Sequence, residues 1–145
     1  MQFTELPSFL TLYPKYNTLE YFELLSHLST CPPLDANIFK SNIETIMSMG
    51  TIIVAHMADK IIASGTIIVE PKIIRGGKCV GHIEDIVVHP LYRGQGISQI
   101  LLQKLQEYAV SKNCYKIILD CNNSVSNVYL KHGFKVSGIQ MSNYL

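Results

Sequence analysis

The sequence predicts an α+β domain built around one mixed, mostly antiparallel sheet with flanking helices. Three observations lead to this prediction. Apolar residues recur at helical spacing in two early segments and one long late segment, and β-rich apolar runs lie between them. The length of 145 residues fits one domain. No repeat, low-complexity tract or linker divides the chain, so residues 1–145 are interpreted as a single domain.

Two helices are expected ahead of the first strand. In residues 17–29 the apolar side chains recur at helical spacing, and Asn17 or Thr18 can cap the start of this helix. Asp35 can cap a second helix, which ends near Gly50.

The central strands follow these helices. Residues 51–56 and 61–71 are apolar and β-rich, and the turn residues 58–60 between them predict a hairpin. Gly76-Gly77 signals another turn, after which residues 82–89 are expected to form a central strand.

The second half alternates helix and strand. Residues 96–112 form a long amphipathic pattern and residues 116–121 an apolar strand. A short helix over 126–131 is expected to end at Gly133, because glycine adopts the left-handed conformation of a helix C-terminus. Two closing strands are predicted, over residues 134–136 and 139–144.

Composition and charge argue against several classes of protein. The net charge of +1 argues against a nucleic-acid binder, which needs an excess of cations. The four cysteines form no CxxC pair and the histidines do not fall at zinc-ligand spacing from them, so no metal is expected. The first residues lack the pattern of a secretory signal, and no run reaches the ~18–20 apolar residues of a membrane span. A cytoplasmic protein with reduced thiols and no membrane partner is expected.

The most informative stretch is a glycine-rich loop between a strand and a helix, residues 93–98. Gly94 and Gly96 let the backbone approach a ligand, and the helix that follows presents unpaired N–H groups suited to a pyrophosphate. No Gly-Lys-Ser/Thr follows, which excludes a Walker loop. Taken alone, the pattern is more typical of a glycine-rich turn before an ordinary helix.

The surroundings of the loop resemble the acetyl-CoA site of the GNAT N-acetyltransferase superfamily. That pattern, Arg/Gln-x-x-Gly-x-Gly/Ala, corresponds to residues 93–98 with Ser98 at the last position. Residues 127–134, which include Tyr129-x-x-x-Gly-Phe, resemble the tyrosine element of the same superfamily. The resemblance implies acetyl-CoA as co-substrate. The residues it implies for binding acetyl-CoA are Ile86, Val87, Val88, Arg93, Gly94, Gln95, Gly96, Ile97, Ser98 and Tyr129.

Two further runs resemble the glucosamine 6-phosphate N-acetyltransferases of this superfamily. They are Gly-His-Ile-Glu-Asp at residues 81–85 and Cys-Tyr-Lys-Ile-Ile-Leu-Asp-Cys at residues 114–121. The resemblance extends from residue 17 to the C-terminus and does not include residues 1–16. It implies acetyl transfer from acetyl-CoA to the 2-amine of glucosamine 6-phosphate, which supplies UDP-N-acetylglucosamine synthesis, by direct attack in a ternary complex.

The same resemblance implies roles for single residues. A bulge in the strand of residues 86–88 would free backbone N–H groups that polarise the thioester carbonyl. Tyr129 would donate a proton to the CoA thiolate, and Asp120 would orient the sugar amine and help take its proton. The structural alternatives are a rim residue for Tyr129 and a turn cap for Asp120. The resemblance implies Tyr129, Asp120 and Glu84 as catalytic residues. It implies as substrate-binding residues Ser29, Lys72, Arg75, Glu84, Asp85, Ile86 and Asp120.

Glu84 and Asp85 are neighbours on a predicted strand, so their side chains should face opposite sides unless the bulge turns one of them. The family also forms homodimers whose C-terminal strands cross, with an arginine reaching the phosphate from the partner. Tyr144 stands at that position and carries no positive charge, and Val125 replaces an asparagine that often contacts the cofactor.

Two other functions fit the sequence. One is acetylation of another amine, such as a polyamine, an aminoglycoside or a protein N-terminus, which the Tyr144 departure favours. The other is a non-catalytic acyl-CoA-binding module, against which the presence of Tyr129 and the acidic residues argues.

Overall fold

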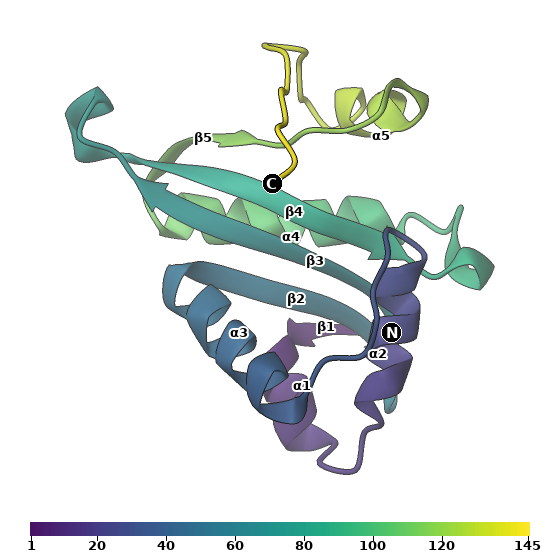
Figure 1. Cartoon of the computed structure of the whole chain (residues 1–145). Coiled ribbons are helices and arrows are strands. Elements are labelled where there is room, and N and C mark those ends of the chain that lie inside the picture. The colour runs from purple at the N-terminus through teal and green to yellow at the C-terminus, as the bar shows by residue number, and fades with distance from the viewer.

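A computed structural model describes residues 1–145 and contains a five-stranded sheet in the order β1-β2-β3-β4-β5 (Figure 1). The first four strands pair antiparallel and β5 runs parallel to β4, which confirms the predicted mixed, mostly antiparallel sheet. The strands are β1 Gln2–Glu5, β2 Gly50–Met57, β3 Lys60–Pro71, β4 Cys79–Val88 and β5 Cys114–Ile118.

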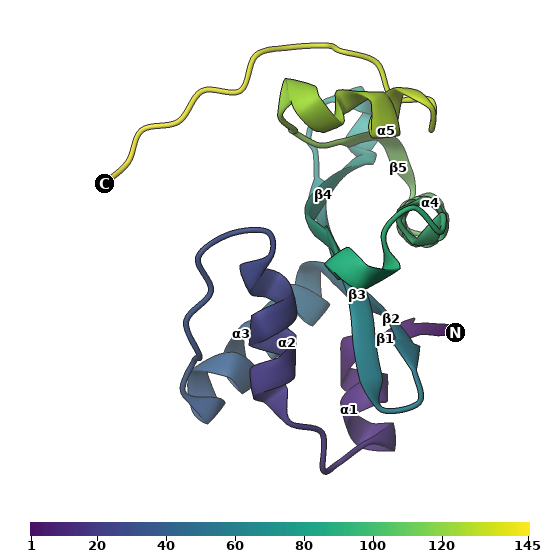
Figure 2. The same ribbon diagram turned by 90° about the vertical axis from the view of Figure 1, so that its right-hand side faces the viewer.

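Helices cover both faces of the sheet, with α4 on one face and α1, α2 and α3 on the other (Figure 2). The predicted caps are present, because Asn17 accepts a hydrogen bond from the N–H of Leu19, and Asp35 from the N–H groups of Asn37 and Ile38. The helices are α1 Leu6–Leu12, α2 Thr18–Ser26, α3 Ala36–Met49, α4 Ile97–Ser111 and α5 Ser126–Leu130, with 3-10 turns η1 Arg75–Gly77, η2 Pro90–Tyr92 and η3 Asn123–Val125.

The sheet separates two apolar cores. Alternation along β2 sends Ile53 and Ala55 toward α4, and Ile52 and Val54 toward α1 and α2. Burying one such large aliphatic side chain stabilises the fold by about 1.5–3 kcal/mol. The core beside α4 contains Ile53, Ala55, Ile62, Ala63, Ile67, Ile83, Ile97, Leu101, Leu102, Leu105 and Ala109. The core of the other face contains Leu6, Phe9, Tyr21, Leu24, Ile52, Val54, Ile61 and Val87.

The first sixteen residues are part of the fold, although no element was predicted for them. β1 forms an edge strand on β2, and Leu6 and Phe9 of α1 are fully buried in the second core. Pro7 occupies the first turn of α1, where its missing N–H costs no hydrogen bond. The spacing of Leu6, Phe9 and Leu10 on α1 was the signal available in the sequence.

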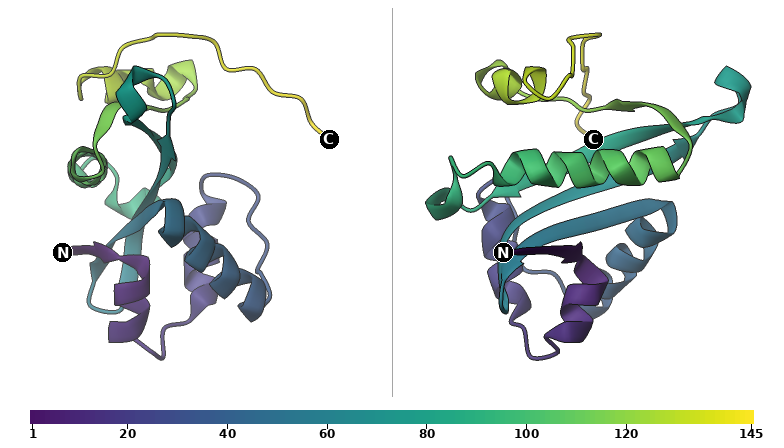
Figure 3. Two further views of the ribbon diagram at one scale, coloured as in Figure 1. Left: turned by 90° about the vertical axis from the view of Figure 1, so that its left-hand side faces the viewer. Right: turned by 180° about the vertical axis from the view of Figure 1, so that it is seen from behind.

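The closing strands predicted for residues 134–136 and 139–144 are wrong for this chain. After α5 and the Gly133 turn, whose φ of 83° confirms the predicted helix end, the chain has no regular structure and runs away from the sheet (Figure 3). A strand requires the backbone of a neighbour, and no strand of this sheet pairs with the tail. The alternating Ile139 and Met141 are therefore 92% and 89% exposed.

Candidate active site

A bulge interrupts β4. One residue of β3, Gly65, stands opposite two residues of β4, Asp85 and Ile86. Asp85 has a φ of 53°, in the left-handed region that asparagine and aspartate tolerate better than most residues. A bulge leaves part of the strand backbone outside the ladder and re-aims nearby groups. The bulge implied by the family resemblance is therefore present, at the start of the segment Ile86–Val88.

β4 and β5 separate next to this bulge. Their pairing runs from Cys79 with Cys114 to His82 with Ile118, whereas β4 continues to Val88. The strand predicted over 116–121 is accordingly shifted, because the chain after Ile118 has no partner in β4. One edge of the second half of β4 is thus free of any strand, and its backbone groups remain available to a ligand.

The glycine-rich loop follows the free end of β4. The Nε–H of Arg93 donates a hydrogen bond of 3.0 Å to the carbonyl of Val88, which ties the loop to the strand. Gly94 and Gly96 both have a φ of 75°, which disfavours other residues. No side chain caps α4, so the N–H groups at its start, around Ile97, remain free. A strand end, a positive-φ loop and an uncapped helix N-terminus together suit a phosphate-bearing ligand.

Two carboxylates come together where the strands separate. Partial burial raises the pKa of Glu84, and the negative charges of Asp120 and Asp85 raise it further. Asp120 follows β5 and forms no hydrogen bond or ion pair within the chain, so it does not cap the turn that begins at Asn122. A carboxylate without a partner beside Glu84 is suited to bind a cationic or proton-donating group.

Asp85 interacts with α2 and with the segment that follows it. Its charge raises the pKa of Tyr21 on α2 and of Cys31 after α2, in both cases behind the larger effect of burial. The two adjacent carboxylates thus interact with different parts of the chain, as strand alternation predicts. The hydroxyl groups of Tyr21 and Ser64 form a buried hydrogen bond of 2.9 Å, which fixes α2 beside the bulge. The sequence showed Tyr21 on an apolar helix face but not which strand it meets.

Tyr129 lies on α5, where the following turn holds its backbone. The N–H groups of His132 and Phe134 donate to its carbonyl, and its ring packs edge-on against Phe134 with centroids 6.0 Å apart. Burial raises the pKa of the Tyr129 hydroxyl, with smaller contributions from Cys121 and Asp120. The hydroxyl therefore stays protonated at neutral pH, as a proton donor requires, and it lies near the chain that carries Asp120.

The other residues predicted to bind the substrate lie on two further segments, with Ser29 after α2 and Lys72 and Arg75 in the β3–β4 connection. Ser29 follows α2, and this segment meets the end of β4 where the rings of His27 and His89 lie 5.2 Å apart. Lys72 and Arg75 lie at the tip of the β3–β4 hairpin, at the end of β4 far from the glycine loop (Figure 1). Their predicted contact with a substrate phosphate stays a prediction.

Lys72 belongs to a hydrogen-bonded network that was not predicted from the sequence. Glu70 of β3 accepts from the ammonium group of Lys72 and, at 2.7 Å, from Nε2 of His82. These two bonds lower the pKa of Glu70. His82 stands two residues before Glu84 on the same strand, and its charge opposes the rise in the pKa of Glu84. The signal in the sequence was the period of two that places His82 and Glu84 on one side of β4.

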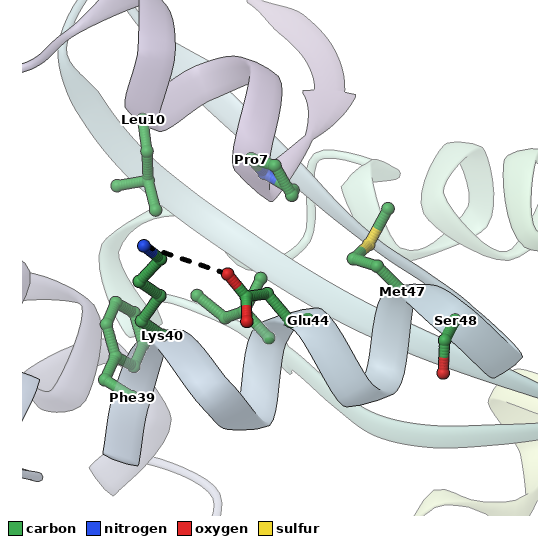
Figure 4. A pocket seen from close by; sticks show the side chains of 8 residues that line it. Pro7, Leu10, Phe39, Lys40, Glu44, Met47 and Ser48 are labelled. Carbon is green, nitrogen blue, oxygen red and sulfur yellow. Dashed lines mark ion pairs between the residues drawn. The ribbon is translucent and has the colours of Figure 1, made fainter. Parts of the chain in front are cut away.

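A well-formed apolar groove of the surface lies elsewhere. It has a volume of about 670 Å³ between α1 and α3, and the ammonium of Lys40 and the carboxylate of Glu44 lie 3.9 Å apart at its rim (Figure 4). None of the predicted site residues lines it. No group of three His, Cys, Asp or Glu side chains gathers to hold a metal ion, and none of the helices has the length and apolar character needed to cross a membrane.

The negative charges around Glu84 should lower the stability of the folded protein when no ligand is bound. Because the pKa of Glu84 in the folded state lies above its ordinary value of 4.5, ionised Glu84 favours unfolding at neutral pH. Glu84→Gln should therefore raise the melting temperature at pH 7, and the difference should vanish as the pH falls below about 4.5, where the carboxyl is protonated in both states. Thermal unfolding across this pH range, with exposed Glu23→Gln as control, measures it. A lower melting temperature at pH 7 would contradict the repulsion.

Known proteins are similar to this chain in sequence and in fold. The acetyltransferase (GNAT) family model matches residues 15–134. The chain is 40% identical over 126 residues to the glucosamine 6-phosphate N-acetyltransferase of Trypanosoma brucei brucei, covering 83% of this chain and 84% of that protein. It is 38% identical over 131 residues to the probable glucosamine 6-phosphate N-acetyltransferase 2 of Oryza sativa subsp. japonica, covering 86% and 79%.

Structural comparison agrees with the sequence comparison. The crystal structure of glucosamine-6-phosphate N-acetyltransferase from Arabidopsis thaliana matches with a TM-score of 0.86 at 30% identity, over 99% of this chain and 97% of that one. The bulged β4, the separating β5 and the glycine loop thus lie in a fold shared with these relatives. The chain belongs to the GNAT acetyltransferase family and, within it, to the glucosamine 6-phosphate N-acetyltransferases.

Proposed function

We propose that the chain transfers the acetyl group of acetyl-CoA to the 2-amine of glucosamine 6-phosphate, giving N-acetylglucosamine 6-phosphate for UDP-N-acetylglucosamine synthesis. The observation that carries this proposal is the negative charge of Asp120 acting on Glu84 where β5 leaves the bulged β4, the strand whose end leads into a loop suited to phosphates. The relatives named above support the choice of substrate.

Direct attack in a ternary complex accounts for the arrangement. The neutral amine attacks the thioester carbonyl carbon, and the N–H groups freed around Ile86–Val88 stabilise the oxyanion that forms. Asp120, with Glu84 beside it, orients the amine and takes its proton. The carbon–sulfur bond then breaks, and Tyr129 gives a proton to the departing thiolate. Release of the proton from Asp120 to solvent and reprotonation of Tyr129 from solvent complete the cycle.

The substrate is tested by release of CoA thiol from acetyl-CoA with glucosamine 6-phosphate or unphosphorylated glucosamine as acceptor. We expect a strong preference for the phosphorylated sugar. Equal turnover with both sugars would contradict phosphate recognition, and turnover with neither would contradict the substrate while leaving acetyl-CoA binding to be measured separately.

A second candidate is acetylation of a different amine. It is favoured by Tyr144 in place of the family's arginine. If a panel of polyamines, aminoglycosides and peptide N-termini gives faster thiol release than glucosamine 6-phosphate, this candidate replaces the first.

We also propose a homodimer that acts in the cytoplasm. The tail after Gly133 exposes apolar side chains, with Val136 at 85% and Ile139 at 92%, and β5 is an unpaired sheet edge, as strand exchange between two copies would require. The four free cysteines fit a reducing compartment. Light scattering of the full chain tests the dimer, and a monomer at micromolar concentration would contradict it.

A further inference from the structure

Two cysteines lie at the start of β4 and β5, where the two strands first pair. Cys79 and Cys114 are backbone partners in this parallel pair, immediately before an irregularity of the register between Cys79 and Val80. Paired residues on neighbouring strands lie about 4.7–4.9 Å apart in the direction of hydrogen bonding, and disulfides span Cα separations of about 4.4–6.8 Å. The register therefore gives this pair a backbone separation that a disulfide can bridge.

Both side chains lie on the α4 face of the sheet. Cys114 packs against the core beside α4. Gly81 has the same orientation as Cys79 by strand alternation, and a Cβ built on Gly81 would meet Ala109 of α4 at 3.5 Å. Cys79 and Cys114 thus project to one side of the sheet, as a bond between their sulfur atoms requires.

Small reagents can reach the pair. Both cysteines are free and partly exposed, and Cys114 lines an open groove of about 450 Å³ together with Tyr115 and Phe134. Burial raises the pKa of the Cys114 thiol, and its closeness to Cys79 raises it further. Cys114 is therefore a thiol at neutral pH, which makes its oxidation slow and dependent on the oxidant.

We propose that Cys79 and Cys114 are a modification site, at which a peroxide or a small disulfide oxidises them to a reversible intramolecular disulfide. With a peroxide, one thiolate attacks an oxygen, the O–O bond breaks, and a sulfenic acid and one water form. The second thiol attacks the sulfenic sulfur, the S–S bond forms, and a second water leaves. The two thiols lose two electrons and two protons, and the peroxide is reduced to two waters. With a small disulfide, one thiolate displaces a thiol and forms a mixed disulfide, and the second cysteine displaces the other thiol, so the reagent is reduced to two thiols. Exchange with a small dithiol restores both cysteine thiols and leaves the dithiol oxidised to its own disulfide.

The bond would join the two strands just before they separate. Cross-linking residues 79 and 114 closes a loop of intermediate length, which restricts the unfolded chain. We expect the oxidised protein to melt roughly 5–10 °C higher than the reduced protein. This site is distinct from Glu84, Asp120 and Tyr129, so its test does not depend on the acetyl acceptor.

The test uses the full-length double variant Cys31→Ser with Cys121→Ser, which keeps only the proposed pair. The folded variant is treated with hydrogen peroxide and with oxidised glutathione, and its thiols are counted before and after addition of dithiothreitol. We expect both thiols to disappear and return together, and mass spectrometry of digested, unreduced protein to show a peptide joined through Cys79 and Cys114.

The matched control is the Cys79→Ser with Cys114→Ser variant, which keeps the other two cysteines and should form no intramolecular bond. Three results would overturn the proposal: retention of both thiols in the folded variant under oxidant, glutathione bound to a single cysteine as the final product, or cross-links only between chains. If the Cys31→Ser and Cys121→Ser changes impair folding, peptide mapping of the oxidised wild-type chain decides the same question.

Discussion

Tyr129→Phe should lower kcat for acetyl transfer by about 10²–10⁴-fold, the usual contribution of a positioned proton donor. The phenylalanine ring keeps the edge-on packing against Phe134, whereas the hydroxyl with its raised pKa is lost. The CoA thiolate must then leave without a proton from the protein. Thiol release under saturating substrates measures the loss, and calorimetric titration with acetyl-CoA should give nearly the wild-type affinity.

Tyr115→Phe is the matched control, because Tyr115 is a partly buried tyrosine on β5 that lines another groove. It should retain full turnover. A Tyr129→Phe protein that binds acetyl-CoA and turns over at the wild-type rate would remove Tyr129 from the chemistry and leave it a packing residue of α5.

Asp120→Asn should reduce amine-dependent turnover by about 10²–10⁴-fold while acetyl-CoA binding is preserved. The amide has nearly the shape of the carboxylate but cannot take the proton of the attacking amine. Since a higher pH supplies more neutral amine, the variant should recover part of its rate as the pH rises. Thiol release against pH and an independent binding titration separate these effects.

The melting temperature and a control variant show whether Asp120→Asn still folds correctly. Asp120→Asn removes a negative charge beside Glu84, so the melting temperature at neutral pH should not fall. Asp59→Asn, in the exposed turn between β2 and β3, should leave turnover unchanged. Equal losses of acetyl-CoA binding and turnover in Asp120→Asn, with a lower melting temperature, would indicate damage to the fold and contradict a role in proton transfer.

Elements with local signals were predicted well. The β2–β3 hairpin has its turn residues, α4 has its amphipathic repeat and glycine loop, and α3 has its Asp35 cap, so each is encoded within its own segment. β1 was not predicted, because only four residues form it and its partner lies in β2, some fifty residues away in the chain. The closing strands failed for the opposite reason, since an alternating pattern indicates a strand without supplying a neighbour.

The candidate site also combines parts with a local sequence signal and parts that depend on contacts distant in the chain. The loop at residues 93–98 and the tyrosine element at residues 127–134 are contiguous, and their motifs could be read directly. The approach of Glu84 to Asp120 depends on the register of β4 with β5 and on where those strands separate. That register is set by packing against α4, which no spacing in the sequence encodes. Family resemblance implied the bulge, and the left-handed Asp85 is its physical form.

The unpaired edge of β4 has a consequence for how the protein tolerates change. Amide hydrogens along that edge should exchange with deuterium faster than those bonded to β3, and acetyl-CoA bound there as proposed should slow their exchange. Recognition through main-chain atoms depends little on which side chains the strand carries. Under the proposed binding, substitutions over Ile86–Val88 that keep strand propensity should therefore alter core packing before they alter the affinity for acetyl-CoA.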